Sequence, residues 1–277
     1  MLLYIIRNME IDMREVVGKK DILLLCLDTL RYDVAVQEEQ NGGTPVLNSL
    51  GEQWEKRHAP GNFTYPSHFA FFAGFFPSPA DAHLFKQRKW LFYPSRVGTA
   101  HAAPAESYEF SRATFVESLF DDGYETICIG GVRFFSKLNE IGRVFPGYFH
   151  KSYWRPTFGC PEKESARQQV EFAVDKLRKC PIEQRVLMYI NFSAIHYPNY
   201  FYVEGKKEDD LETHAAALRY VDSQLPLLLE TFRKRGETLV VVFSDHGTCY
   251  GEDGFYNHCL SHELVYTVPY KHFILEQ

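Results

Sequence analysis

Three separate stretches of the chain carry side chains that could bind a cation and attack an ester. The motif Ser244-Asp245-His246-Gly247 follows the apolar run 238–243, and Asp28 follows a second apolar run, 21–27. In parallel sheets the active site lies at the carboxyl ends of the strands, so these side chains are expected at one edge. Two carboxylates and an imidazole make a ligand set for a divalent metal. The spacing therefore predicts a metal site made by Asp28, Asp245 and His246, although Asp28 alone is also typical of a helix cap.

A loop between these two strands supplies a hydroxyl. Thr64 lies in the loop 62–68, and the apolar stretch that follows predicts a helix over 68–76 whose N-terminal amides can hold an anion. A threonine in this place is, on its own, more often a cap than a catalyst. Coordination to a divalent metal lowers the pKa of a hydroxyl and makes attack on phosphorus feasible. We therefore expect Thr64 to be a metal ligand and the nucleophile.

The elements that must position these residues follow an alternating pattern. Apolar runs typical of strands lie at 22–27, 125–129, 185–192, 238–243 and 265–275. Helical periodicity lies between them, at 44–57, 68–76, 114–122, 165–179 and 213–234. This alternation indicates a parallel sheet covered by helices on both faces. We therefore predict an α/β protein, a three-layer α/β/α sandwich with a mostly parallel central sheet.

The length sets the number of domains. A single α/β domain of 277 residues buries roughly three quarters of its unfolded surface, so one ample core is the expectation. We expect an N-terminal extension at 1–18 and a single catalytic domain at 19–277. The stretch 81–111 is rich in His, Pro and Ala and keeps no period, which predicts an irregular lid or excursion near the site.

Composition excludes several classes of function. The net charge of -6 offers no basic face, so no nucleic-acid partner is expected. No apolar run approaches the roughly 20 residues of a membrane span, and the opening MLLYII is too short for a secretory signal. The six cysteines show no C-x-x-C spacing, and Cys26 and Cys128 sit inside apolar strands. This pattern favours reduced, buried thiols in a cytoplasmic protein.

Taken together, the motifs resemble the alkaline phosphatase superfamily, and within it the sulfatase-like branch. A narrower resemblance is to the short sulfatase-like proteins of bacterial gene clusters that encode radical-SAM enzymes. The motifs keep the family's order and span about residues 20 to 275. They are Asp28-Thr29-Leu30-Arg31 after its strand, Thr44-Pro45-Val46-Leu47, Thr64-Tyr65-Pro66-Ser67-His68 with Gly74 and Pro77, His196-Tyr197-Pro198, Ser244-Asp245-His246-Gly247 with Gly251-Glu252, and Val268-Pro269.

The resemblance implies a fold and a set of roles. The fold would be alkaline phosphatase-like without the C-terminal subdomain of larger sulfatases, which leaves the site open or completed by a protein partner. Asp28, Asp245 and His246 would take the metal positions, and Thr64 the nucleophile position.

Four further residues take substrate-facing positions by the same resemblance. His196 falls where the family has a histidine that faces the substrate oxyanion or leaving group, and His258 matches a basic position that contacts the same group. A loop histidine stacked on neighbouring tyrosines is the plainer interpretation of His196. His68 stands where sulfatases carry an arginine, and we expect it to bind substrate together with Asn62.

The departures from the family pattern narrow the chemistry. Sulfatases oxidise a Cys or Ser to formylglycine, and Thr64 cannot form that aldehyde, so hydrolysis of sulfuric esters is disfavoured. Threonine there resembles the phosphodiesterase and phosphotransferase members. Thr29 replaces the second aspartate of the sulfatase calcium site, so Zn or Mn is favoured over Mg or Ca.

Two-metal members add a D-x-x-x-H pair and a later histidine. Asp210 and His214 have that spacing, and His262 is a candidate third ligand beside His258 and His272. Charged residues at a helix start are also commonly a solvated cap, which is the alternative interpretation of this pair.

The function we expect is a metal-dependent hydrolase or transferase that acts on a small-molecule phosphate ester, either a phosphodiester or a phosphomonoester. The alternatives are a non-catalytic sulfatase-like scaffold in a biosynthetic cluster, a two-metal phosphomonoesterase or mutase, and a sulfuric ester hydrolase.

Overall fold

The central element is a seven-stranded sheet with the strand order β2-β11-β8-β1-β7-β5-β6. The structure is a computed structural model that describes residues 11–50, 53–74, 90–92, 107–109 and 113–277. The strands of the sheet are β1 (Asp21–Leu27), β2 (Glu55–His58), β5 (Glu125–Ile129), β6 (Lys151–Tyr153), β7 (Val186–Phe192), β8 (Thr238–Phe243) and β11 (Thr267–Leu275). From β8 to β6 all neighbours are parallel, and β11 runs antiparallel to both β8 and β2. The predicted mostly parallel sheet is confirmed.

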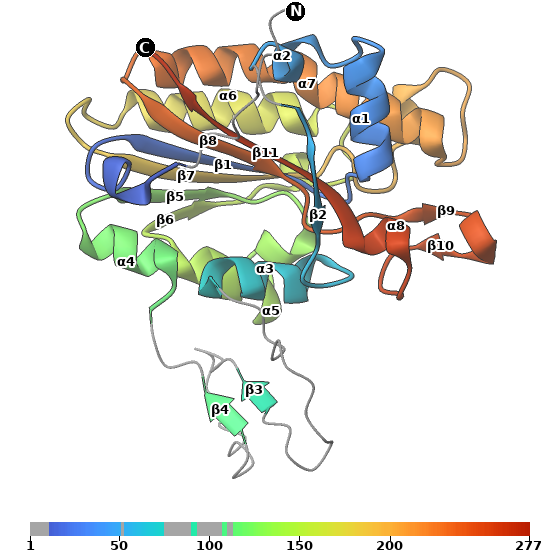
Figure 1. Cartoon of the computed structure of the whole chain (residues 1–277), viewed down its shortest axis with the longest axis horizontal. Helices are drawn as coiled ribbons and strands as arrows, with labels where there is room; N and C mark the ends of the chain where they lie inside the picture. Colours follow the sequence, from blue (N-terminus) through green and yellow to red (C-terminus); the bar gives the residue numbers. More distant parts are fainter. Residues whose placement is uncertain (1–10, 51–52, 75–89, 93–106, 110–112) are drawn as a thin grey trace, which may run out of the picture.

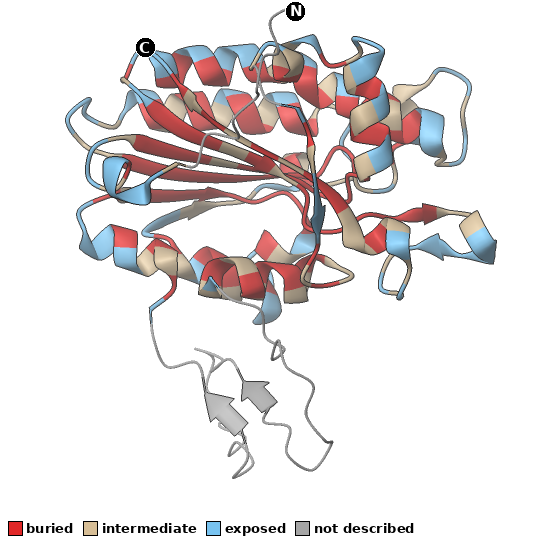
Figure 2. Cartoon of the chain, in the orientation of Figure 1, coloured by how far each residue is buried: buried red, intermediate tan, exposed pale blue. Residues whose placement is uncertain are grey.

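Helices cover both faces of this sheet, as Figure 1 shows. One face carries α1 (Tyr32–Gln40), α2 (Pro45–Asn48), α6 (Ser165–Arg178) and α7 (Leu211–Arg233), and the other carries α3 (Thr64–Ala73), α4 (Phe115–Asp121) and α5 (Ile141–Val144). Strand β1 shows why there are two cores, because its side chains alternate between them. Leu23, Leu25 and Leu27 enter one buried cluster, and Ile22 and Cys26 enter the other. The three-layer α/β/α architecture is thereby confirmed, and Figure 2 shows the buried sheet between the exposed outer helix faces.

The remaining described elements are short and lie in the connections. They are β3 (Trp90–Phe92), β4 (Ser107–Glu109), β9 (Cys249–Tyr250), β10 (Tyr256–Asn257), α8 (Glu263–Tyr266), and the 3₁₀ turns η1 (Met13–Glu15), η3 (Arg133–Phe135), η4 (Phe145–Tyr148), η5 (Pro156–Phe158), η6 (Tyr200–Tyr202) and η7 (Glu252–Gly254). The pair β9–β10 forms an antiparallel hairpin directly after the Asp245-His246 motif.

One predicted helix is wrong. The short α2 is the only helix among the described residues of the segment 44–57, and the last residues of this segment form β2 at the edge of the sheet. Pairing with β11, in which His58 lies opposite Thr267, outweighs the local helical pattern. Two other differences are smaller: α3 begins at Thr64 instead of His68, and α1 is a helix that the sequence pattern did not indicate.

The described part of the predicted N-terminal extension, residues 11–18, packs against the domain. Residues 1–10 lie outside the described residues, but Val16 is buried with 1% exposure in the core. The hydroxyl of Tyr124 donates to the Val16 carbonyl oxygen and accepts from the Gly18 amide, at 3.2 and 2.9 Å. A boundary at residue 18 therefore falls within packed structure. The predicted lid at 81–111 lies outside the described residues except for β3 and β4, which pair in parallel.

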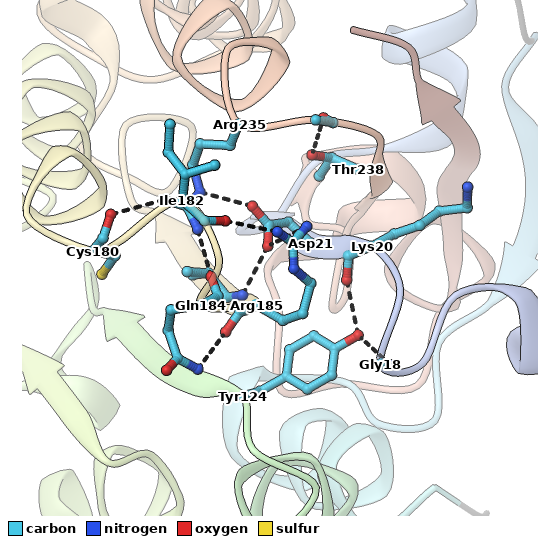
Figure 3. A network of polar contacts seen from close by, with 12 residues as sticks. Gly18, Lys20, Asp21, Tyr124, Cys180, Ile182, Gln184, Arg185, Arg235 and Thr238 are labelled. Carbon is cyan, nitrogen blue, oxygen red and sulfur yellow. Dashed lines mark hydrogen bonds and ion pairs between the residues drawn. The ribbon is translucent and has the colours of Figure 1, made fainter.

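A buried ion pair anchors the amino ends of the central strands (Figure 3). Asp21 begins β1, and its carboxylate accepts from the Val186 amide at 2.9 Å and from Arg235 Nε at 2.8 Å. The Arg235 guanidinium also donates to carbonyl oxygens of Cys180 and Gln184, at 3.0 and 2.6 Å. These bonds join the starts of β1 and β7 to the turn before β8, at the edge opposite to the candidate site.

Candidate active site

The carboxyl ends of β1 and β8 bring three potential metal ligands together. Asp28, Asp245 and His246 offer ligand atoms that all lie within 4.8 Å of one another. His246 Nε2 is 3.8 Å from Asp28 Oδ1 and 3.5 Å from Asp245 Oδ2. All three side chains are fully buried. The convergence of two parallel strand ends thus produces a compact group of two carboxylates and an imidazole.

Thr64 lies at the edge of this group. It is the first residue of α3. Thr64 Oγ1 is 3.5 Å from Asp28 Oδ2 and 3.4 Å from His246 Nε2. The hydroxyl is therefore beside the atoms that would hold a cation, at the N-terminus of a helix.

Backbone and side-chain bonds orient each ligand. His246 Nδ1 donates to the Gly247 carbonyl oxygen at 2.9 Å, which leaves the Nε2 lone pair for the cluster. Asp28 Oδ2 accepts from Asn191 Nδ2 at 2.9 Å, and Asp245 Oδ1 accepts from the Thr29 amide at 3.3 Å. One oxygen of each carboxylate is thus held by the protein, and the other points at the neighbouring ligands.

The free atoms of the cluster fit a divalent cation. Asp28 Oδ1 and Asp245 Oδ2 are buried and have no hydrogen-bond partner among the described residues. Burial and the mutual repulsion of the two carboxylates raise the pKa of Asp28 to about 6, and burial raises the pKa of Asp245 to about 7. Burial lowers the pKa of His246 to about 4, so its imidazole is neutral and able to ligate. Buried carboxylate oxygens without partners are costly, and a bound cation would satisfy both.

Two histidines face this cluster from neighbouring loops. His258 follows the β9–β10 hairpin, and its ring centroid lies 4.5 Å from that of His246 and 5.3 Å from that of His196. His196 follows β7, and its Nδ1 donates to the Tyr197 carbonyl oxygen at 2.7 Å. The ring of His196 also stacks on Tyr197, with 4.3 Å between the ring centroids. Stacking on a neighbouring tyrosine, the alternative interpretation of this residue, therefore describes part of its environment.

The two histidines differ in their electrostatic surroundings. Burial opposes the charge of His196, but Cys160 and the Asp28 carboxylate beside it raise its pKa to about 10. Burial and the neighbouring His246 lower the pKa of His258 to about 3. The structure therefore places one imidazole that favours a proton and one that does not at the rim of the cluster.

His68 corrects an expectation. Its ring is fully buried, with Nδ1 donating to the Thr64 carbonyl oxygen at 2.7 Å and Nε2 accepting from the Tyr189 hydroxyl at 2.5 Å. Both ring nitrogens are thus occupied beneath the cluster, so His68 supports the first turn of α3 instead of contacting substrate. Asn62, the other expected substrate contact, joins its loop to the hairpin region, because its carbonyl oxygen accepts from the Cys259 amide at 2.8 Å.

A second group, formed by Cys26, His68 and Asp245, also has ligand atoms within 4.8 Å of one another. Its chemistry is unsuited to a cation. The nitrogens of His68 are occupied, and burial raises the pKa of the Cys26 thiol well above its usual range. Cys26 and His68 therefore pack under the site as neutral side chains, and Asp245 belongs to the cluster above them.

The expected second metal site is not assembled. Among the described residues, Asp210, His214 and His262 do not form a group with ligand atoms near one another. Asp210 caps α7 by accepting from the Thr213 amide at 3.0 Å, and His262 caps α8 by accepting from the Leu264 amide at 3.1 Å. The alternative interpretation of a helix cap is thus correct for Asp210.

Asn191 is a site residue that sequence reasoning missed. It lies in β7 opposite Cys26 of β1, and it connects Asp28 to the loop after β5 by accepting from the Val132 amide at 3.0 Å. A polar residue near the end of an otherwise apolar strand was the available signal.

Comparison with known proteins decides the family. The family model described as "Sulfatase" matches residues 20–270. The chain belongs to the sulfatase family. No curated protein matches the chain. Among the described residues, no helix has both the length and the apolar character needed to cross a membrane.

Several solved structures share this fold with the sulfatase-family chain. The C-terminal periplasmic domain of the phosphoethanolamine transferase EptC from Campylobacter jejuni is 15% identical, with a TM-score of 0.60, and the match covers 92% of this chain and 79% of that one. A protein of the alkaline phosphatase superfamily from Vibrio parahaemolyticus is 18% identical, with a TM-score of 0.54 and coverages of 93% and 60%. The periplasmic domain of EptC from Escherichia coli, in complex with Zn, is 15% identical, with a TM-score of 0.56 and coverages of 91% and 71%. At these identities the similarity establishes the alkaline phosphatase-like fold.

Proposed function

We propose that this sulfatase-family protein is a metal-dependent enzyme that hydrolyses or transfers a phosphate ester through Thr64. The observation that carries the proposal is the position of the Thr64 hydroxyl, 3.5 Å from Asp28 Oδ2 and 3.4 Å from His246 Nε2. The other oxygen of Asp28 and one oxygen of Asp245 in the same cluster have no hydrogen-bond partner among the described residues. The similarity to a phosphoethanolamine transferase of the same fold supports phosphoryl transfer as the reaction class.

A divalent metal would be held by Asp28, Asp245 and His246, with Thr64 Oγ1 as a further ligand. Zn or Mn suits a donor set of carboxylates with one imidazole better than Mg or Ca does, and the E. coli structure in complex with Zn supports that choice. When bound, such an ion supplies positive charge that lowers the pKa of the hydroxyl and polarises the ester.

The protein's own residues then account for the transfer. Thr64 Oγ1 gives up its proton to solvent and bonds to phosphorus while the bond from phosphorus to the leaving oxygen breaks. The leaving oxygen takes a proton from His196 and departs as an alcohol. The intermediate is a phosphothreonine for a monoester, or the ester of a phosphothreonine for a diester. Water or a second alcohol attacks the same phosphorus and releases Thr64. His196 and His258 face the cluster from two loops, where they stabilise the equatorial charge or assist the leaving group. Asn191 and the Thr29 amide keep the two carboxylates in place during both steps.

The choice of phosphate over sulfate follows from the side chain of Thr64. A threonine cannot be oxidised to the aldehyde that sulfatases use, whereas its hydroxyl suffices for attack on phosphorus. A phosphodiester or phosphomonoester is therefore the proposed substrate class, with turnover of sulfuric esters as the contrasting outcome.

Replacement of the hydroxyl tests the mechanism. Thr64→Val keeps the shape of the side chain but removes Oγ1, so kcat/KM on bis-p-nitrophenyl phosphate or p-nitrophenyl phosphate should fall by about three orders of magnitude or more. Thr64→Ser is the matched control, because it keeps a hydroxyl and should retain part of the turnover. Metal content, measured by elemental analysis, should stay near that of the wild type in Thr64→Ser. It should fall only slightly in Thr64→Val, because Asp28, Asp245 and His246 remain as ligands.

The same experiment discriminates among the alternatives. Full turnover by Thr64→Val would remove Thr64 from the mechanism. A wild type that holds metal but turns over neither phosphate nor sulfate esters would favour the scaffold function. Mass spectrometry of acid-quenched wild type should detect phosphate on the peptide that contains Thr64, and it should detect none in Thr64→Val.

We also propose a cytoplasmic location. Its support is the presence of free, buried cysteines, since burial raises the pKa of Cys26 and of Cys128 and keeps both as thiols. The two similar EptC structures are of periplasmic domains, so fractionation of producing cells decides the question. Recovery of the protein with periplasmic markers would overturn this assignment.

A further inference from the structure

His214 is a buried group whose chemistry the proposed mechanism does not use. It lies in the first turn of α7 with no solvent exposure. Its Nε2 is 3.3 Å from the Arg31 amide, and its Nδ1 is 2.9 Å from the Tyr250 hydroxyl. Because an amide can only donate, Nε2 must be the acceptor, and Nδ1 must carry the proton that is donated to Tyr250. The ring is therefore neutral, in one tautomer, and has no lone pair left for a metal.

The bond to Arg31 reaches the loop that carries Asp28. Arg31 is three residues after Asp28, at the end of the tight turn that follows β1. In this turn Thr29 has a left-handed φ of 66° and donates its amide to Asp245. The Arg31 side chain forms ion pairs with Asp33 and Glu252, so this residue links the turn to the β9–β10 hairpin. The backbone of the turn is thereby held by His214, and the Arg31 side chain ties it to the hairpin.

The bond to Tyr250 reaches the two loops that carry the rim histidines. Tyr250 belongs to the hairpin that leads to His258, and its hydroxyl accepts from Asn199 Nδ2 at 3.2 Å. Asn199 also donates to the carbonyl oxygen of Ile195, which precedes His196, at 2.8 Å. Its Oδ1 accepts from the Thr213 hydroxyl at 2.5 Å, which returns the network to α7.

We propose that His214 is a positioning residue of the candidate active site: it locks the turn after Asp28, the loop of His196 and the hairpin of His258 onto the N-terminus of α7. This inference rests on the proposed metal function, because its main consequence is the affinity of the site for a divalent cation. Groups that orient metal ligands without touching the metal typically change metal affinity by about 10–100-fold when they are removed. Burial, followed by the nearby Arg31 charge, lowers the pKa of His214 to about 3, in agreement with a neutral ring.

Two conservative variants separate the two bonds of His214. Gln places an acceptor close to the Nε2 position, and Asn places a donor close to the Nδ1 position. His214→Gln should therefore keep the bond to the Arg31 amide, with Zn²⁺ affinity within about threefold of the wild type. His214→Asn should lose that bond and weaken Zn²⁺ binding about tenfold or more. The measurement is a competition titration of Zn²⁺ against a chromogenic chelator, without any substrate.

A control on the same helix excludes a merely structural role. Asp222 of α7 is buried and accepts from the amides of Val46 and Leu47, far along the helix from the site. Asp222→Asn should lower the unfolding midpoint as much as the His214 variants do, but it should leave Zn²⁺ affinity unchanged. Equal Zn²⁺ affinity in wild type, His214→Asn and Asp222→Asn would overturn the inference. An equal loss in His214→Gln and His214→Asn would also overturn it, because the bond to Arg31 would then be irrelevant.

A third variant covers a failure of His214→Asn to fold. Tyr250→Phe removes only the hydroxyl of a half-buried side chain, and it should weaken Zn²⁺ binding about threefold. Unchanged affinity in Tyr250→Phe would count against the network. A wild type that binds Zn²⁺ but turns over no ester would overturn the proposed function alone, since the affinities still report on His214.

Discussion

At the scale of single residues, the most unusual feature is a pair of carboxylates kept without full hydrogen bonding in the interior. Asp28 and Asp245 each keep one buried oxygen without a partner in the described part of the chain. Their pKa values are raised, so the protein resists their ionisation when no cation compensates the charge. Binding geometry is thus maintained at the expense of stability, which is common in active sites.

Asp28→Asn tests whether the Asp28 carboxylate costs stability. The amide should keep the bond with Asn191 and remove the charge, so the free energy of unfolding of the metal-free protein should rise by about 1–3 kcal/mol. The same variant should lose most of its affinity for Zn²⁺. Urea unfolding in the presence of a chelator, and again with Zn²⁺, measures both effects. A metal-free variant that is less stable than the wild type would show that the Asp28 carboxylate is already satisfied.

At the scale of elements, β1 is held at both ends by groups of different kinds. Its first residue, Asp21, is bonded to Arg235 and to the β7 backbone, and both ionic side chains are almost fully buried. Its carboxyl end carries Asp28 toward the site. The strand between them is apolar and lies between β7 and β8 at the centre of the sheet. Substitutions at the amino end of β1 should therefore change stability without changing metal binding.

Replacement of Arg235 tests this separation. Arg235→Met removes the shorter ion pair of the buried Asp21 carboxylate and leaves only the longer one, to Arg185 at 3.6 Å. The free energy of unfolding should therefore fall, by up to about 3–5 kcal/mol. Zn²⁺ affinity of the folded protein should not change, because the pair lies at the opposite edge of the sheet from the cluster. Glu237→Gln is the control, since it removes the more exposed pair of Glu237 with Lys20 and should change the stability by less than about 1 kcal/mol. A Zn²⁺ affinity that falls with Arg235→Met would show coupling between the two ends.

At the scale of the whole molecule, the site is formed by the loops that follow several strands of the sheet. The first turns of α3 and α7 contribute Thr64 and His214 to it. The network around His214 connects the loops after β1 and β7 with the β9–β10 hairpin. Its central imidazole is buried in neutral form, so the integrity of this assembly depends on pH.

The stability of the metal-free protein should fall in acid, in part because of His214. Its pKa is lowered in the folded state from the ordinary 6.5 to about 3, so below pH 6.5 the unfolded chain binds a proton that the folded protein excludes. This contribution is fully present above pH 6.5 and is lost toward pH 3 at about 1.4 kcal/mol per pH unit. Between pH 8 and pH 5 the wild type should therefore lose about 2 kcal/mol more than His214→Gln does. The measurement is urea unfolding of both proteins at pH 8 and at pH 5. An equal loss of stability in the wild type and in His214→Gln would show that folding does not lower the pKa of His214.

Much of the fold follows from local pattern. Apolar runs such as 21–27 and 238–243 become central strands because almost every residue in them is apolar. Side chains on both faces of the strand can therefore be buried. The segment 44–57 shows the limit of this reasoning, since its helical spacing was outweighed by the pairing of Glu55–His58 with β11. The edge strand β2 forms because it pairs with β11, which lies about 200 residues later in the chain. The local sequence around 44–57 carries no information about that pairing.

The sequence alone predicted that Asp28 and the Asp245-His246 pair follow the ends of strands, because the apolar runs stop just before them. It placed Thr64 in the loop before a helix, and the structure begins that helix at Thr64 itself. Only the tertiary structure decided which polar groups satisfy one another. His68 and His214 have the residue type and spacing of site ligands, yet their nitrogens are occupied by Tyr189, Tyr250 and the Arg31 backbone. Those partners lie far from them in the chain, and burial makes such bonds obligatory only once the chain has folded around them.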